Sequence, residues 1–251
     1  MTGDSTVLLS IWIVFLLLGG GMTAQHLYGR RILRRERARS EQLYHQLESL
    51  FSLFHLLPLR RPLPPMRNWA VSPDFARILL AEVMEQKPSR VLELGSGVST
   101  IVTGYGLEKI NGGAIVSLEH DATFAETSRR EVERHGLSER CRILHAPLEL
   151  HTLQGRTFRW YSTKAFEGIE DIDLLIVDGP PANIQSMARY PALPVLIGKL
   201  APSAVVLIDD AARPDEQRMI AEWSAQFPGF KVEWISAEKG TCRLRRKAPP
   251  G

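Results

Sequence analysis

The sequence predicts an α/β domain built on a doubly wound, mostly parallel sheet, preceded by two helical segments of a different kind. Beyond Asn68, short apolar runs alternate with stretches of helical periodicity, the order typical of parallel strands joined by helices. The runs at 172–177 and 204–208 are apolar throughout, as expected of strands buried on both faces of a sheet. The seven expected strands are residues 90–94, 114–118, 142–145, 172–177, 204–208, 231–236 and 241–245.

Helical periodicity predicts one helix before the first strand, at residues 74–86, and two between later strands, at 122–135 and 215–227. Ser72 and Pro73 suit the start of the first helix, with serine as the N-cap and proline in the first turn. Gly136 suits the end of the second helix, because glycine readily adopts the left-handed conformation found there. Strands and helices together place the α/β domain at residues 66–251.

Residues 1–29 are predicted to be a membrane anchor. The run at 6–24 has no charged side chain, and a helix of that length rises about 28 Å, close to the thickness of a hydrocarbon core. Six arginines lie within 30–39, after the apolar run, whereas a secretory signal peptide has its positive charge in front. The positive-inside rule then predicts a single-pass membrane protein whose N-terminus is outside and whose remainder is cytoplasmic.

Residues 30–65 form a basic segment, a second helix and a linker. Apolar side chains recur at three- and four-residue steps within 41–57 and predict one stripe of a helix, made of Leu43, Leu47, Leu50, Phe51 and Phe54. This stripe could pair with a second copy, lie on the membrane, or pack on the α/β domain; we expect packing or a homodimer. A proline-rich stretch at 58–65 ends the helix and forms a stiff linker.

Charge and cysteine content exclude several classes of protein. A formal net charge of +3 is too small to indicate a nucleic-acid partner. The two cysteines, Cys141 and Cys242, are far apart and lie in no metal-binding spacing, so neither a disulfide framework nor a zinc site is expected.

A glycine loop follows the first strand, as Gly95, Ser96 and Gly97, and a helix follows the loop. Ligands of such sheets bind at the carboxyl ends of strands, where glycines let the backbone approach closely. A dinucleotide-binding loop has a third glycine where this chain has Thr100. Glu93, just before the loop, would repel a pyrophosphate and attract the ammonium group of S-adenosylmethionine.

The second and third strands also end in polar residues. The spacing between Glu119 and the glycine loop is one at which a carboxylate can accept hydrogen bonds from both hydroxyls of a ribose. The alternative is a structural role, because an acid just before a helix is stabilised by the helix dipole. Asp121 fits this structural role better than Glu119 does, as the N-cap of the following helix. His145 ends the third strand, where a packed or exposed histidine is more common than a catalytic one.

Three aspartates follow the fourth and fifth strands: Asp178, Asp209 and Asp210. Asp178 would lie beside the methyl donor, although an aspartate before Gly-Pro is also a usual turn residue. Three carboxylates from neighbouring strand ends could hold a divalent cation, or Asp209 and Asp210 could cap the next helix or bind an arginine.

In this order, the motifs resemble those of class I S-adenosylmethionine-dependent methyltransferases, from about Pro65 to the C-terminus. VLELGSGVST at 91–100 is similar to the family's first motif and Glu119 to its second. DLLIVDGPP at 173–181, RYPALP at 189–194 and VVLIDDAARPDE at 205–216 look like one bacterial branch of the family, as does LPPMRNWAVSPD at 63–74.

The resemblance implies a Rossmann-like methyltransferase fold, with S-adenosylmethionine as cofactor, and assigns its contacts. Around the methionine part it places Glu93, Gly95, Ser96 and Gly97, with Asp178 nearby, and Ser99 and His120 are further candidates for contact with the cofactor. It places Glu119 at the ribose, Ala146 and Pro147 at the adenine, and Trp69 and Ser72 closing the site from the N-terminal side. The set Asp178, Asp209 and Asp210 is similar to the metal ligands of catechol-type O-methyltransferases. A metal is not favoured, however, because that subgroup has Asp-Asn in place of Asp209-Asp210. It also has a lysine shortly after its first aspartate, where this chain has Pro180, Pro181 and Ala182.

We therefore expect a membrane-anchored methyltransferase whose acceptor is an oxygen of a small molecule or of a membrane-associated envelope or lipid-linked precursor. Asp178 and Asp209 are the first candidates for the base, ahead of Asp210, His145 and His120. An NAD-dependent oxidoreductase is disfavoured by Thr100 and Glu93. A degenerate domain acting as a membrane-tethered interaction module is the main alternative.

Overall fold

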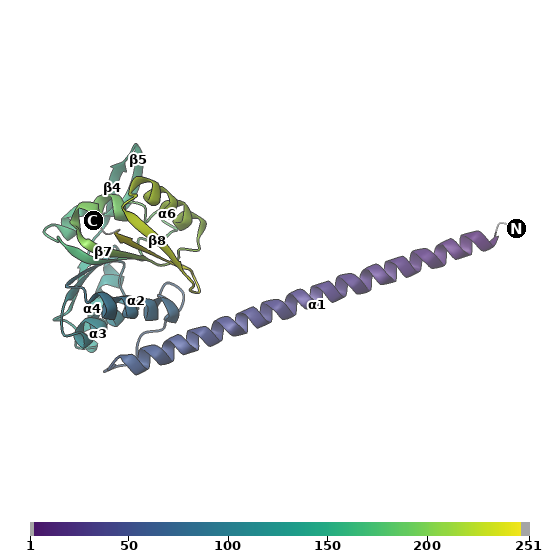
Figure 1. The fold of residues 1–251 in the computed structure, drawn as a ribbon, viewed down its shortest axis with the longest axis horizontal. Coiled ribbons are helices and arrows are strands. Elements are labelled where there is room, and N and C mark those ends of the chain that lie inside the picture. The colour runs from purple at the N-terminus through teal and green to yellow at the C-terminus, as the bar shows by residue number, and fades with distance from the viewer. Residues whose placement is uncertain (1–2, 247–251) are drawn as a thin grey trace, which may run out of the picture. The chain divides into compact units, whose positions relative to one another are not determined.

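The computed structural model describes residues 3–246, without the side chains of residues 3–11 and 13–24. The chain divides into two units, Met1–His45 and Gln46–Gly251. Helix α1 (Gly3–Leu56) makes up the described part of the first unit and continues into the second (Figure 1). Among the described residues, none of the helices combines the length and the apolarity needed to cross a membrane. Apart from Trp12, the predicted span at 6–24 lies outside the described side chains, so the anchor stays a prediction.

A seven-stranded sheet forms the centre of the second unit, in the order β3-β2-β1-β6-β7-β9-β8. The first five strands in this order are parallel, and β9 is antiparallel to both of its neighbours. This confirms the predicted doubly wound, mostly parallel sheet. The strands are β1 (Arg90–Leu94), β2 (Ala114–Glu119), β3 (Cys141–His145), β6 (Ile172–Val177), β7 (Leu200–Ile208), β8 (Phe230–Ile235) and β9 (Thr241–Arg246).

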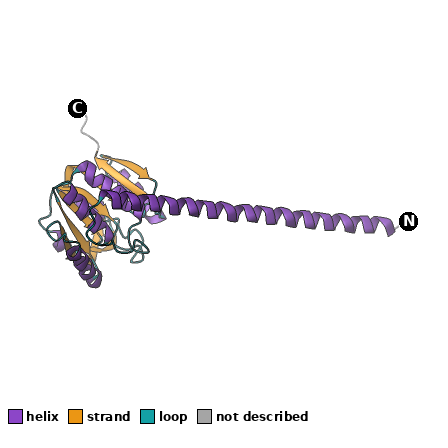
Figure 2. Cartoon of the chain, turned by 90° about the horizontal axis from the view of Figure 1, so that it is seen from below, coloured by secondary structure: helices purple, strands orange, loops and turns teal. Residues whose placement is uncertain are grey.

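Helices cover both faces of this sheet and bury a core on each side (Figures 1 and 2). One core joins the sheet to α2 (Pro73–Gln86), α3 (Val98–Lys109) and α4 (Ala122–Arg134). The other joins it to α5 (Ala192–Leu196) and α6 (Pro214–Gln226). Strands covered on both faces account for the continuous apolar runs in the sequence.

The end of α1 packs against the domain, but not through the predicted stripe. Gln46, Ser49, Leu53 and Leu57 are buried, and Leu53 and Leu57 belong to the same core as α2 and α3. Of the stripe, Leu47, Phe51 and Phe54 remain exposed, at 52%, 71% and 53%. The domain therefore covers the face of the helix next to the stripe, and the homodimer through 41–57 stays a prediction.

A two-stranded antiparallel sheet between β3 and β6 was missed in the sequence. It consists of β4 (Leu148–Leu153) and β5 (Arg156–Tyr161), followed by the short helix η1 (Thr163–Phe166). A second short helix, η2 (Ile197–Lys199), leads into β7, which begins four residues before its predicted start at 204. Trp160 and Tyr161 at the end of β5 are fully buried, so the hairpin contributes to the core beside the strand ends.

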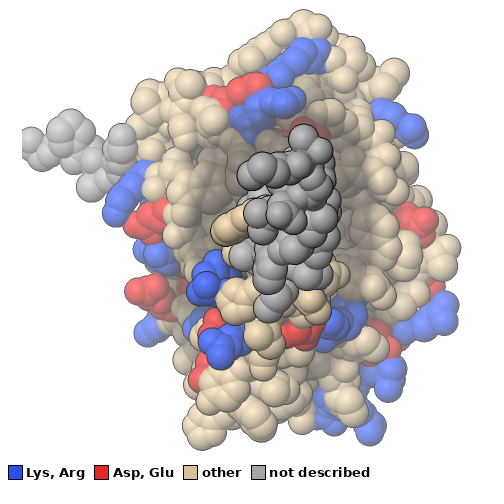
Figure 3. All heavy atoms as spheres, turned by 90° about the vertical axis from the view of Figure 1, so that its right-hand side faces the viewer, with Lys and Arg blue, Asp and Glu red and all other residues tan. Residues whose placement is uncertain are grey.

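Positive and negative side chains are interspersed on the face of the molecule shown in Figure 3. In the view of Figure 3, Lys and Arg side chains alternate with Asp and Glu over the visible face, without a broad area of one sign. This agrees with the small net charge of the chain.

Candidate active site

A pocket of about 570 Å³ opens at the carboxyl ends of β1, β2 and β6. The loop after each strand contributes to its lining, and so do the linker before α2 and the turn between β8 and β9. The lining includes eight residues predicted from the sequence: Trp69, Gly95, Ser96, Gly97, Ser99, Glu119, His120 and Asp178. The structure thus brings most of the predicted cofactor residues to one cavity.

The glycines of the loop after β1 are required by its backbone. Gly95 and Gly97 have φ values of +114° and +142°, which residues with a Cβ rarely adopt. A Cβ on Gly95 would also lie 3.7 Å from the Cβ of Asp178, so the loops after β1 and β6 approach closely. The loop therefore offers backbone rather than side chains to a ligand.

Glu93 lies beneath this loop and does not line the pocket. It is fully buried, and its Oε2 accepts hydrogen bonds from Thr100 Oγ1 (2.6 Å) and Ser117 Oγ (2.5 Å). Thr100 also accepts a hydrogen bond from the backbone amide of Gly97 (3.1 Å). Thr100, which stands where a dinucleotide-binding loop has its third glycine, thus joins the loop to Glu93. Burial raises the pKa of Glu93 to about 7, although the hydroxyl hydrogen bonds oppose the shift.

Glu119, at the end of β2, is 7% exposed and lines the pocket. It accepts hydrogen bonds from Ser96 Oγ (3.0 Å) and the backbone amide of Asp121 (3.1 Å), and His120 Nδ1 lies 2.9 Å from its Oε1. These contacts fix the carboxylate at the pocket wall, where a pair of ligand hydroxyls can donate to it. Asp121 caps α4 by accepting from the amides of Thr123 (2.8 Å) and Phe124 (3.0 Å), which confirms its expected role.

Other predicted residues lie outside the pocket lining. Ser72 is buried and donates to Asp74 Oδ1 (2.5 Å) instead of facing the cavity. Ala146 is buried, with its amide bound to the Glu119 carbonyl (2.7 Å), and Pro147 is exposed after β3. Asp209 is fully buried behind Asp210 and is not part of the lining.

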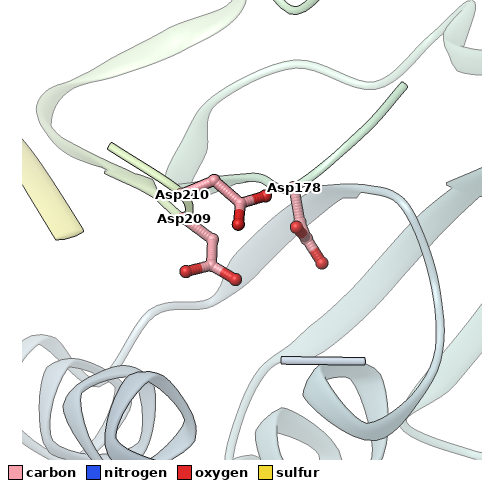
Figure 4. Close-up of side chains that lie close together, drawn as sticks. All are labelled: Asp178, Asp209 and Asp210. Carbon is pink, nitrogen blue, oxygen red and sulfur yellow. The ribbon is translucent and has the colours of Figure 1, made fainter. Parts of the chain in front are cut away.

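Asp178, Asp209 and Asp210 converge from the ends of β6 and β7. Each offers a carboxylate oxygen, and these oxygens all lie within 4.8 Å of one another. Figure 4 shows the carboxylate of Asp210 directed toward Asp178 from the neighbouring strand end. Asp178 and Asp210 line the pocket, and the side chain of Asp178 is 18% exposed.

Comparisons with known proteins agree with this geometry. The model of a family described as a methyltransferase domain matches residues 92–211, from β1 to the residues after β7. The fold is similar to that of an O-methyltransferase from Bacillus cereus in complex with SAH, at 20% identity over 80% of this chain and 90% of that one, with a TM-score of 0.56. It is also similar to the O-methyltransferase TomG from Streptomyces achromogenes in complex with SAM, at 17% identity over 83% and 96% of the two chains and a TM-score of 0.55.

A methyltransferase from Geobacter sulfurreducens is similar at 17% identity over 69% and 78% of the two chains, with a TM-score of 0.52. The comparison with curated proteins gives no match. The chain has a methyltransferase fold. Identities this low establish the fold alone, so the chemistry has to be argued from the site.

A divalent cation fits poorly among the three aspartates of this methyltransferase fold, because an arginine already binds two of their three carboxylates. Arg189 Nη2 lies 2.8 Å from Asp210 Oδ2 and 3.3 Å from Asp178 Oδ1, and Nη1 donates to the backbone carbonyl of Asp209 (2.9 Å). A metal would have to share these ligands with a guanidinium. Of the alternatives open in the sequence, the structure therefore places an arginine among the acids.

The pKa values of these groups follow their burial. Burial raises the pKa of Asp178, and Arg189 opposes the shift. Burial and the neighbouring carboxylates of Asp178 and Asp210 raise the pKa of Asp209 well above its ordinary value. Burial works against the charge on Arg189, but the carboxylates of Asp178 and Asp210 outweigh it and raise the pKa.

Arg189, Tyr161, Arg213 and Lys239 are pocket residues to which sequence reasoning gave no role. Tyr161 ends the hairpin that was not predicted, and Lys239 lies in the turn between β8 and β9. Arg189 stood inside a recognised motif, but its position between β6 and α5 says nothing about which way its side chain points. The one available indication was that two adjacent aspartates at a buried strand end need a cationic partner.

Glu93 makes the stability of the domain depend on pH. Its pKa is raised in the folded chain, so its stabilising effect is complete below pH 4.5 and is lost as the pH rises through about 7. We expect the free energy of unfolding of the wild type to fall by about 3 kcal/mol over that range relative to Glu93→Gln. Denaturant titrations at several pH values measure the difference.

Glu139→Gln, at an exposed position on the same domain, is the matched control and should follow the wild type. Parallel curves for the wild type and Glu93→Gln would show that Glu93 is not a buried carboxyl with a raised pKa.

Proposed function

We propose that this chain is a methyltransferase that uses S-adenosylmethionine and transfers its methyl group to an oxygen of an acceptor. The observation that carries the proposal is the meeting of the glycine loop, Glu119 and Asp178 in one pocket at the strand ends. The methyltransferase-domain match and the fold shared with O-methyltransferases support it.

Charge in the pocket supports this cofactor over a dinucleotide. Acidic side chains line the wall on the side of the loop and of α4: Glu119, Asp121 and Glu131. Asp178 adds another beside Gly95. They attract the ammonium and sulfonium groups of S-adenosylmethionine and repel a pyrophosphate. The sequence assigned this electrostatic role to Glu93, but Asp178 is the better candidate, because it lines the pocket and Glu93 does not.

The remaining contacts follow from the walls of the pocket. The Glu119 carboxylate is positioned to accept hydrogen bonds from the two ribose hydroxyls. The loop glycines let the backbone lie against the amino-acid part. Phe124, 61% exposed in the first turn of α4, offers an aromatic edge for the adenine, and Trp69 is a second aromatic residue of the pocket lining. We do not assign Ala146 or Pro147 to the adenine, since neither lines the pocket.

Bound in this pocket, S-adenosylmethionine would supply an electrophilic methyl group, and the chain has to position the acceptor and remove its proton. Asp178 is the base that we propose. Its side chain lines the pocket, and burial raises its pKa toward the pH at which the enzyme works. A general base is most effective when its pKa lies near that pH. Asp209 is unsuited to this step, because it is fully buried and lies outside the pocket lining.

We also propose that residues 6–24 anchor the enzyme in a membrane, with the N-terminus outside and the catalytic domain cytoplasmic. The uncharged apolar run and the arginines after it support this proposal. The acceptor would then be a small molecule or a membrane-associated precursor.

Alkaline carbonate extraction of cells that make the full chain tests the anchor. We expect the wild type in the membrane pellet and Val14→Arg/Leu17→Arg in the supernatant, because two charges at the middle of the span oppose insertion. The matched control is Leu43→Arg, outside the span, which should stay in the pellet. Wild-type chain in the supernatant would contradict the proposal.

Calorimetric titration of the full chain with S-adenosylhomocysteine tests the cofactor site. We expect one site per chain and a loss of about tenfold or more in affinity for Glu119→Gln, because its side chain no longer offers a charged acceptor to the ribose. Glu133→Gln, an exposed change on α4, should bind like the wild type. Undiminished binding by Glu119→Gln would refute the ribose assignment, and no binding by the wild type would refute the proposed function.

A further inference from the structure

Arg189 lies on the connection between β6 and α5, and its side chain is buried, with 4% exposed. A guanidinium taken out of water is costly unless charges and hydrogen bonds compensate it. Here the compensation comes from the strand-end acids, so Arg189 and the acids form one electrostatic unit.

The guanidinium lies at the centre of that unit. Nη2 contacts Asp210 (2.8 Å) and Asp178 (3.3 Å), Nη1 donates to the Asp209 carbonyl (2.9 Å), and Glu216 Oε1 lies 3.9 Å from Nη1. Four acidic residues from β6, β7 and α6 therefore surround one buried cation.

Two positive groups already share one carboxylate oxygen of Asp210, which also lines the pocket. Asp210 Oδ2 lies 2.8 Å from Arg189 Nη2 and also 2.8 Å from Arg213 Nη1. Asp178 Oδ1 is bound by the same Arg189 nitrogen. A divalent cation here would find Asp178 Oδ1 and Asp210 Oδ2 already engaged, with two guanidinium charges within a few ångströms, whereas both carboxylate oxygens of Asp209 have no hydrogen-bond partner.

We infer that Arg189 is the built-in cation of this site: it occupies the place that the three strand-end aspartates would otherwise offer to a divalent metal, and it holds Asp178 against the pocket. The three aspartates alone have the ligand chemistry of a Mg²⁺ or Mn²⁺ site, with oxygen donors from neighbouring strand ends. Arg189 and Arg213 offset part of that negative charge without a metal. Arg189 is then a positioning residue that acts through Asp178.

The action of Asp178 on an acceptor rests on the proposed function, but the identity of the cation does not. The deciding experiment measures the binding of Mn²⁺ to the protein, without cofactor or acceptor. Full chain freed of metals is titrated with MnCl₂, and free Mn²⁺ is followed by its electron paramagnetic resonance signal. We expect no bound Mn²⁺ in the wild type up to about 1 mM, beyond which even weak protein sites for hard cations fill.

Arg189→Met removes the guanidinium and keeps an unbranched side chain. This variant should bind one Mn²⁺ per chain, and Mn²⁺ should raise its thermal unfolding midpoint while leaving that of the wild type unchanged. A merely structural arginine would give a destabilised variant with no response to the metal. The double variant Arg189→Met/Asp178→Asn should lose the Mn²⁺ site again.

Arg213→Met is the matched control, since it removes the other guanidinium from the same Asp210 oxygen and leaves Arg189 in place. It should bind no Mn²⁺. The inference is overturned if the wild type binds one Mn²⁺ that Asp178→Asn abolishes, or if folded Arg189→Met binds none. The wild-type titration decides the matter even where Arg189→Met does not fold.

Discussion

The buried ion-pair cluster around Arg189 is the constraint on which the rest of the site depends. It ties the end of β6, the end of β7 and the first turn of α6 to one guanidinium, through Asp178, Asp210 and Glu216. Removing one partner of such a buried pair typically costs about 3–5 kcal/mol, because the other charge is left without compensation. The cluster thus fixes the position of Asp178, which is at once the wall of the cofactor pocket and the proposed base.

A second, smaller network shapes the neighbouring loop. Thr100 connects the amide of Gly97 to the buried carboxyl of Glu93, and Ser117 on β2 binds the same carboxyl oxygen. Glycines give the loop its unusual backbone, and the hydroxyls hold that backbone in one arrangement. The two networks meet where Gly95 approaches Asp178, so the shape of the cofactor pocket depends on both.

Much of the fold was predictable, because buried parallel strands leave continuous apolar runs and their carboxyl ends meet at one edge. All seven strands of the sheet were expected near their observed positions. The hairpin β4–β5 was missed, since apolar and polar residues mix along its strands, which are partly exposed and give no continuous apolar run. For the site, the strand-end motifs predicted that Glu119 and Asp178 lie at one edge of the sheet, and both line the pocket there.

The misplaced residues share one physical reason. A strand-end motif fixes where the backbone runs but not which way a side chain turns, so Glu93 and Asp209 were expected in the pocket and lie beneath it. Arg189 reaches the acids from a connection outside the regular elements, and no periodicity reports that contact. Long-range ion pairs of this kind decide whether three aspartates form a metal site, and only the three-dimensional structure reveals them.

The most direct test of the central claim, methyl transfer that depends on the strand-end pocket and not on a metal, uses methyl-labelled S-adenosylmethionine. Membranes and extracts are incubated with the full chain and a chelator, and the labelled material is fractionated. We expect label to pass to an acceptor with the wild type and not with Asp178→Asn, at cofactor concentrations that saturate both. Transfer that stops when the chelator is added, or that survives in Asp178→Asn, would contradict this mechanism.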